Sequence, residues 1–294
     1  MKIAVLPPAQ AGVAADPDWV VRYARQAEEC GFESFVAIEH PLVVSSYSSR
    51  YPYAESGRMP LRDDCAIPDP LELLSFVAAS TTTLGLSTGV LVLPAHHPVV
   101  LAKRLATLDV LSGGRLRLCV GLGWMREELE ACGTDFDTRG RRADESIDVM
   151  RALWADSGEK GASFSGEFFS FSDAHSHPKP CRPGGVPIHV GGHSPASMRR
   201  AVRRGDGWQP LGIGGDELRA AIAEFRRQAA EAGRDPAAQE VSVSAVTSAI
   251  TEQTVEKSTA MGIDRLVATS MQPDIDAALE ELVALAARVG LSGR

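Results

Sequence analysis

The chain has 294 residues, of which 44% are hydrophobic, enough to bury a large core in one domain or in two smaller ones. Its formal net charge of -8 argues against nucleic acid or an anionic membrane as a partner. We read neither a membrane span nor a signal peptide, because apolar runs are short and Met1 leads directly into a predicted strand. Five cysteines without a CxxC pair indicate reduced thiols in a cytoplasmic protein.

Strands and helices are predicted to alternate along the chain. The predicted strands cover residues 2–6, 34–38, 85–94, 116–120, 187–190, 207–211, 241–246 and 265–269. The helices that follow them cover residues 17–30, 69–82, 99–111, 138–154, 194–204, 217–232, 252–261 and 274–289. Eight strand–helix units favour a (β/α)8 TIM barrel over an open doubly wound sheet, built as a single domain over residues 1–294.

The third and fourth predicted strands are almost wholly apolar, which is typical of strands buried on both faces of a parallel sheet. The fourth strand ends in Gly121-Leu122-Gly123-Trp124, at the strand end where such sheets bind ligands. This pattern is only half of a dinucleotide-binding fingerprint, because Arg126 occupies the position of the third glycine. A tight turn after the strand would account for these glycines as well as a bound ligand would.

Two connections are too long to be plain turns. Residues 41–68 follow the second strand and contain serines, tyrosines and arginines, and residues 156–186 follow the fourth helix. Loops of this length in a compact domain are usually functional or disordered. We expect the first to cover a substrate, although a mobile surface insertion fits the sequence too. The alternating pattern from Phe164 to Phe171 in the second predicts a small hairpin.

The sequence lacks the residue patterns that several kinds of catalysis require. No lysine ends a predicted strand, which argues against a Schiff-base aldolase. No HExxH or strand HxH pattern predicts a metal site, and no GxSxG elbow predicts a serine hydrolase. We therefore expect no catalytic metal.

Gly191-Gly192-His193-Ser194-Pro195 closes the fifth predicted strand. Two glycines let the backbone approach a ligand, Ser194 can cap the next helix, and Pro195 fits its first turn. Free N–H groups at such a helix start attract phosphate, although an ordinary strand–helix turn would use the same residues.

The chain resembles the bacterial luciferase-like flavin monooxygenases over residues 1 to about 210, and more closely their branch that uses coenzyme F420, a deazaflavin. The resemblance rests on short runs: Thr88-Gly89-Val90-Leu91-Val92-Leu93-Pro94-Ala95-His96-His97-Pro98, Gly114-Arg115-Leu116 through Gly123-Trp124, Glu127-Glu128-Leu129, Cys132-Gly133-Thr134-Asp135-Phe136, Arg139 through Glu145, Phe164 through Phe169, Pro178-Lys179-Pro180, Pro187 through Gly192 and Gly205-Asp206-Gly207-Trp208. Two residues depart from it. Cys119 stands where many members have glycine, and Trp124 where sugar-phosphate-oxidising relatives carry a catalytic glutamate.

The resemblance implies a site at the carboxyl ends of the strands. His40 matches the family's active-site histidine, which would donate a proton or polarise a carbonyl, although a purely structural histidine fits as well. It also implies a bulge with a non-proline cis peptide at Gly89–Val90, and His96 and His97 as residues that orient the following loop. The residues implied to bind the cofactor are Gly89, Val90, Gly121, Gly123, Trp124, Gly191, Gly192, His193 and Ser194, with its phosphate near the last four.

We therefore expect an enzyme that transfers a hydride between reduced F420 and a small organic substrate. The alternatives are an FMN-dependent monooxygenase on the same fold and a barrel that binds a ligand without turnover. We also expect a homodimer, with neither nucleic acid nor membrane as a partner.

Overall fold

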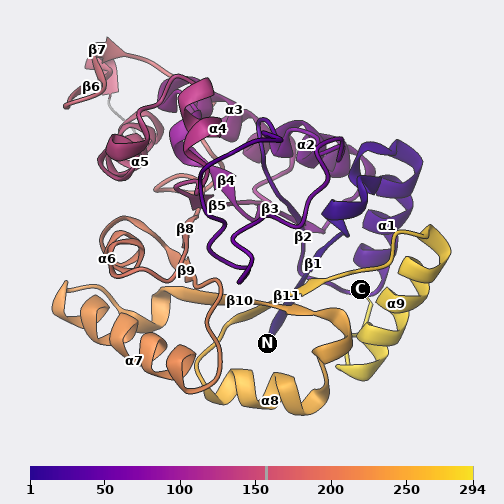
Figure 1. Cartoon of the computed structure of the whole chain (residues 1–294). Helices are drawn as coiled ribbons and strands as arrows, with labels where there is room; N and C mark the ends of the chain where they lie inside the picture. Colours follow the sequence, from indigo (N-terminus) through magenta and orange to yellow (C-terminus); the bar gives the residue numbers. More distant parts are fainter. Residues whose placement is uncertain (156–157, 294) are drawn as a thin grey trace.

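The computed structural model describes residues 1–155 and 158–293 of the chain, and these form a closed parallel barrel surrounded by helices (Figure 1). The strands follow the order β3-β2-β1-β11-β10-β9-β8-β5-β4, and β3 also pairs with β5, which closes the sheet. The barrel strands are β1 (Lys2–Leu6), β2 (Ser34–Ala37), β3 (Gly85–Thr88), β4 (Leu91–Val92), β5 (Leu116–Gly121), β8 (Ile188–Gly191), β9 (Gly207–Gln209), β10 (Glu240–Val246) and β11 (Arg265–Thr269). The predicted barrel is confirmed.

The helices lie outside the strands, as the binary pattern predicts. They are α1 (Pro17–Glu29), α2 (Pro70–Ser80), α3 (Pro98–Leu111), α4 (Arg126–Ala131), α5 (Arg139–Trp154), α6 (Pro195–Arg204), α7 (Gly215–Glu231), α8 (Glu252–Ala260) and α9 (Ile275–Arg288). Asp16 shows why α1 begins where it does, since its carboxylate accepts hydrogen bonds from the backbone N–H groups of Asp18 and Trp19. None of the α-helices described is long and apolar enough to cross a membrane.

The predicted third strand is interrupted. It divides into β3 and β4 at Gly89 and Val90, and the peptide bond between these residues is cis, which confirms the predicted bulge. A side chain at position 89 would lie 2.3 Å from a methyl group of Val36, so glycine is required at this bend. Leu91, Val92 and Leu93 are buried beyond it.

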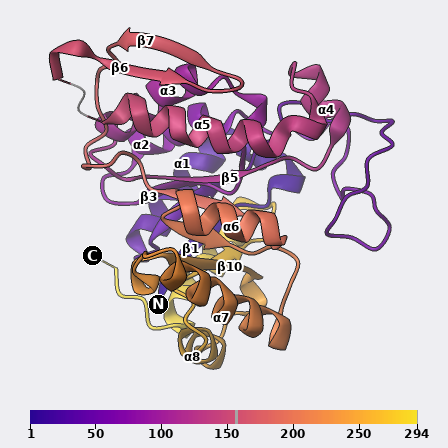
Figure 2. The same cartoon turned by 90° about the vertical axis from the view of Figure 1, so that its left-hand side faces the viewer.

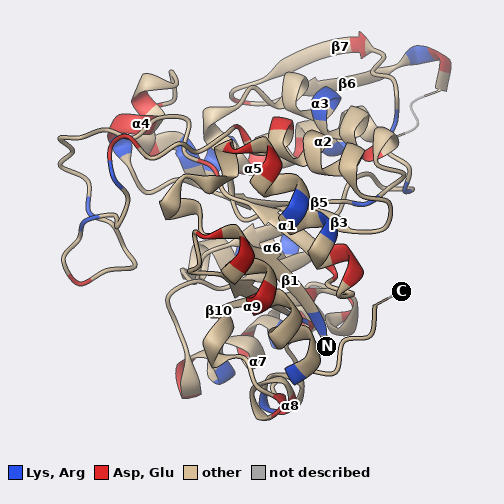
Figure 3. Cartoon of the chain, turned by 90° about the vertical axis from the view of Figure 1, so that its right-hand side faces the viewer, with Lys and Arg blue, Asp and Glu red and all other residues tan. Residues whose placement is uncertain are grey.

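Two segments extend from the barrel. Residues 38–69 connect β2 to α2 and project beyond the ends of the strands in the opposite views of Figures 2 and 3. The predicted hairpin is confirmed as β6 (Ala162–Ser165) paired antiparallel with β7 (Ser170–Ala174), and it packs on α5 (Figure 2). Asp156, where the second insertion was predicted to start, lies outside the described residues with Ser157 and Arg294.

Charged side chains fill the opposite, amino-terminal end of the barrel. The Arg265 guanidinium contacts Glu33 at 2.8 Å and Glu240 at 2.9 Å, and Arg117 also reaches Glu33 at 2.8 Å. These residues lie at the starts of four different strands or just before them. We call them the base network, and their pairing compensates for the cost of burying charge.

Candidate active site

One large cavity opens at the carboxyl ends of the barrel strands, with a volume of about 1160 Å³. The structure brings all ten predicted site residues to its wall, namely His40, Gly89, Val90, Gly121, Gly123, Trp124, Gly191, Gly192, His193 and Ser194. Ligand sites usually have about 300–1,000 Å³, so there is room for a cofactor ring together with a substrate. The roles assigned to these residues stay predictions.

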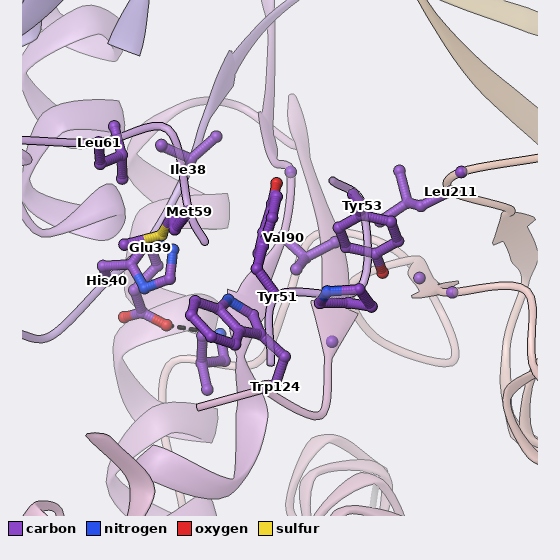
Figure 4. Close-up of a pocket in the computed structure, with 18 of the residues that line it drawn as sticks. Ile38, Glu39, His40, Tyr51, Tyr53, Met59, Leu61, Val90, Trp124 and Leu211 are labelled. Atoms are coloured by element: carbon purple, nitrogen blue, oxygen red, sulfur yellow. Dashed lines mark hydrogen bonds between the residues drawn. The ribbon is translucent and has the colours of Figure 1, made fainter. Parts of the chain in front are cut away.

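Val90 lies in the middle of the cavity wall (Figure 4). A Cβ added to Gly121 would lie 2.6 Å from one Val90 methyl group, and a Cβ added to Gly191 would lie 2.8 Å from the other. Both glycines therefore make room for the Val90 side chain. The result is a surface with few projecting side chains, which suits a flat ligand.

His40 follows β2 and is held by a carboxylate from α4. Its Nδ1 lies 3.0 Å from Oε1 and 3.3 Å from Oε2 of Glu128, and Glu128 is 0% exposed. A buried carboxylate is stabilised by such a partner, and the bond fixes which way the imidazole faces. Nε2 is thereby left for a ligand.

The neighbouring Glu39 makes a second, separate pair. One carboxylate oxygen lies 2.8 Å from His96 Nε2, and the other accepts the Val92 backbone N–H at 2.6 Å. Glu39 thus ties the end of β2 to the segment after the bulge. This agrees with the expectation that His96 orients the following loop.

Glu127 attaches the long loop to α4. Its carboxylate accepts hydrogen bonds from the backbone N–H groups and the hydroxyl groups of Ser48 and Ser49. Burial acts to raise the pKa of Glu127, but these hydrogen bonds outweigh it and lower the pKa to about 2. The carboxylate is therefore ionised, and holds the loop, across the physiological pH range.

Aromatic side chains from this loop surround Trp124. The rings of Tyr47 and Tyr51 meet the indole edge-on, at 5.3 and 5.1 Å between centroids, and the His40 ring lies at 6.5 Å. Burial raises the pKa of Tyr51, which keeps its phenol protonated at neutral pH. The loop predicted to cover a substrate therefore supplies one wall of the cavity (Figure 4).

The glycine turn after β8 is fixed by neighbours across the strand ends. Trp208 Nε1 donates to the Gly192 carbonyl at 2.8 Å, and the Gly192 N–H donates to the Gln209 carbonyl at 2.9 Å. Ser194 caps α6, as predicted, by accepting from the Ser197 N–H. Trp208 is 0% exposed, so its indole lies in the core.

Sequence reasoning missed three residues of the site. Glu127 and Glu128 were quoted only as part of a motif, and α4 itself was not predicted. Arg139 lines the same cavity. Its guanidinium carbon lies 3.6 Å from the centroid of the Phe136 ring, and its Nε has no hydrogen-bond partner among the described residues. A glutamate pair between apolar Met125 and Leu129 was the signal available for α4.

Two mycobacterial proteins match much of the chain. It is 34% identical to an uncharacterized protein of Mycobacterium tuberculosis over 219 residues, which cover 74% of each chain. It is 32% identical to the F420-dependent hydroxymycolic acid dehydrogenase of the same organism over 225 residues, or 74% of this chain and 56% of that protein.

A solved structure shows the same fold. The crystal structure of monooxygenase RslO1 from Streptomyces bottropensis superposes with a TM-score of 0.78 at 20% sequence identity, covering 98% of both chains. The profile of the luciferase-like monooxygenase family matches residues 1–289. The chain belongs to the luciferase-like monooxygenase family and is an oxidoreductase of that family.

Proposed function

We propose that the protein transfers a hydride between the deazaflavin F420 and a small organic substrate. The observation that carries the proposal is the position of the His40–Glu128 pair. It lies beside the surface formed by Val90, Gly121 and Gly191, from which few side chains project. The name of the mycobacterial relative, an F420-dependent dehydrogenase, supports a deazaflavin over a flavin.

The residues of the cavity fit a tricyclic ring. Side chains at positions 121 and 191 would compete with Val90 for space, so the glycines keep projecting side chains out of this part of the cavity wall. Gly192 has a φ of +102°, a conformation that L side chains rarely adopt, and its turn directs the backbone toward the start of α6. Gly192, His193 and Ser194 would hold the phosphate there, with Arg139 as a further cationic group at the cavity wall.

When bound, a reduced deazaflavin supplies a hydride from a carbon of its central ring. The chain contributes position and proton transfer. Glu128 accepts the His40 Nδ1–H and leaves Nε2 to give a proton to a substrate oxygen, or to take one from it. Trp124 and Tyr51 exclude water from this side of the cavity.

The test is a titration of the purified apoprotein with F420 and with FMN, followed by absorbance and fluorescence. We expect micromolar or tighter binding of F420, and hydride transfer measured as the bleaching or return of the oxidised deazaflavin absorbance. Binding of FMN without binding of F420 would contradict the proposal and favour the FMN-dependent monooxygenase. Binding of either cofactor without turnover of any alcohol, ketone or aldehyde would favour a binding protein.

We also propose that the protein is a cytoplasmic homodimer. Its cysteines are all unpaired, as expected in a reducing compartment. The neighbouring helices α2 and α3 expose Phe76, Val100 and Leu111, at 45%, 58% and 77%. Light scattering should give twice the chain mass, and Leu111→Glu should shift it toward the monomer. A monomeric wild type would contradict the dimer.

A further inference from the structure

Cys119 and Gln209 form a buried hydrogen-bonded pair inside the barrel. They lie on β5 and β9, the two strands that flank β8, and the Cys119 Sγ lies 3.1 Å from the Gln209 Oε1. Cys119 is 1% exposed and Gln209 is 5% exposed, and Gln209 lines the cavity. The pair has no part in the function proposed above, although Cys119 stands where many family members have glycine.

The cysteine is held in place and acts as the donor of the pair. Thr88 Oγ1, on the neighbouring β3, accepts the Cys119 N–H at 2.9 Å and donates to the Cys119 carbonyl at 2.6 Å. Burial raises the pKa of the Cys119 thiol to about 12, although Arg117 and Arg265 act against it. The sulfur therefore keeps its proton, and the Gln209 amide is held with its oxygen toward Cys119.

The amide nitrogen of Gln209 is left for a ligand. Its Nε2 makes no hydrogen bond within the described part of the chain, and it is not one of the polar atoms that are enclosed there without a partner. Since Gln209 lines the cavity, this N–H donor reaches the open space. A donor on a side chain that is otherwise buried favours an acceptor atom in the ligand, because leaving it unsatisfied costs free energy.

Gln209 lies beside the Val90 surface, across the barrel from His40. It pairs in register with Gly191, whose missing side chain makes room for Val90. In the barrel order β9 lies opposite β2, the strand that precedes His40. Figure 4 shows Leu211, two residues after Gln209, on the side of Val90 away from His40. A flat ring on Val90 would therefore present to Gln209 the part that is remote from His40.

We propose that Gln209 donates a hydrogen bond to a carbonyl oxygen of the pyrimidinedione ring of the bound cofactor, and that Cys119 is the positioning residue that holds the amide in this orientation. This inference rests on the proposed function and names the residue that meets one end of the ring. The pyrimidinedione carries the carbonyl oxygens of the ring system, which are the acceptors that an amide N–H requires. It is common to flavins and deazaflavins, whereas the hydroxyl at the other end of the ring system belongs to F420 and not to FMN.

Lumichrome is the probe for this contact, because it is a fluorescent tricyclic ring with the pyrimidinedione but without the phosphate chain or the hydroxyl. Gln209→Leu nearly keeps the volume of the side chain and removes the donor. It should weaken binding of both lumichrome and F420 by about fivefold to tenfold in fluorescence titrations, the effect of losing one hydrogen bond. Equal affinity of variant and wild type for lumichrome would overturn the inference. So would a loss of affinity for F420 alone, because it would place Gln209 at the hydroxyl.

Cys119→Ser and Cys119→Ala are the matched variants for the positioning role. A serine hydroxyl can still donate to the Gln209 oxygen, so Cys119→Ser should bind lumichrome within about twofold of the wild type, whereas Cys119→Ala should bind it more weakly. Infrared difference spectra of bound lumichrome should show a lower carbonyl stretching frequency in the wild type and Cys119→Ser than in Cys119→Ala and Gln209→Leu. A cysteine that only fills space would not change this frequency between Cys119→Ser and Cys119→Ala. One frequency in all four proteins would overturn the inference.

The two proposals can fail separately. A wild type that binds lumichrome but not F420 counts against the proposed function, and the lumichrome affinities of the variants still decide the role of Gln209. A wild type that binds F420 and transfers a hydride, but binds lumichrome no better than Gln209→Leu does, overturns only the inference.

Discussion

At the scale of single residues, Glu128 and His40 form one unit, because the buried carboxylate and the imidazole each satisfy the other. We expect His40→Asn to lower kcat by about 100-fold or more, since an amide cannot transfer the proton. Glu128→Gln should lower kcat less, by about tenfold, because the amide keeps the shape but loses the charge. Stopped-flow measurement of hydride transfer checks both.

The control for these variants is cofactor affinity. Neither substitution changes the glycine surface around Val90, so the dissociation constant for F420 should stay within about twofold of the wild type. Unchanged hydride transfer in His40→Asn would show that the histidine is structural.

We predict that Gly121 affects cofactor binding through the space that it leaves for the Val90 side chain. The new methyl group of Gly121→Ala would lie 2.6 Å from a Val90 methyl group and displace that side chain into the cavity. We expect F420 affinity to fall by about tenfold or more, the range of overpacking effects. The double variant with Val90→Ala should recover most of the affinity in the same fluorescence titration. Failure of this rescue would contradict the proposed packing.

At the scale of elements, the long loop depends on Glu127. Glu127→Ala removes four hydrogen bonds to Ser48 and Ser49, and bonds to a charged group contribute about 1.5–3 kcal/mol each when well formed. We expect faster cleavage by trypsin at Arg50 and Arg58 and a several-fold higher KM. Mass spectrometry of the digest identifies the sites. Equal cleavage of variant and wild type would show that other contacts hold the loop.

The elements also show what the sequence could predict. Apolar runs and caps located the barrel strands and the longer helices to within a few residues, because burial on both faces and the capping residues act locally. The third strand was predicted in one piece, and only the resemblance indicated its break at Gly89 and Val90. Helix α4 escaped prediction because its six residues, Arg126–Ala131, are mostly charged and too few to show an apolar period.

At the scale of the whole molecule, the base network links segments far apart in sequence. Burial acts to raise the pKa of Glu240, but Arg265, Lys2 and His189 outweigh it and lower the pKa to about 2. The pKa of Glu33 is lowered too, by Arg117 and Arg265 against burial. No single segment predicts this network, because its members meet only when the barrel closes.

This network predicts acid-sensitive stability. A carboxylate whose pKa falls on folding stabilises the fold above its unfolded pKa, near 4.5, and loses that contribution as the pH falls toward about 2. Urea unfolding should therefore show a falling free energy below about pH 5. Glu240→Gln should be less stable at neutral pH by about 2 kcal/mol and should lose less on acidification. Parallel pH profiles for variant and wild type would exclude Glu240 as the cause.

Helix α4 carries two adjacent carboxylates that hold different parts of the site. Glu127 binds the loop that forms the cavity wall, and the next residue, Glu128, binds the proton-transferring histidine. Opening the loop would break its hydrogen bonds to Glu127, while Leu129, which is 0% exposed, still holds the short helix against the core. The cover of the cavity and the orientation of its histidine therefore depend on adjacent carboxylates of one six-residue helix.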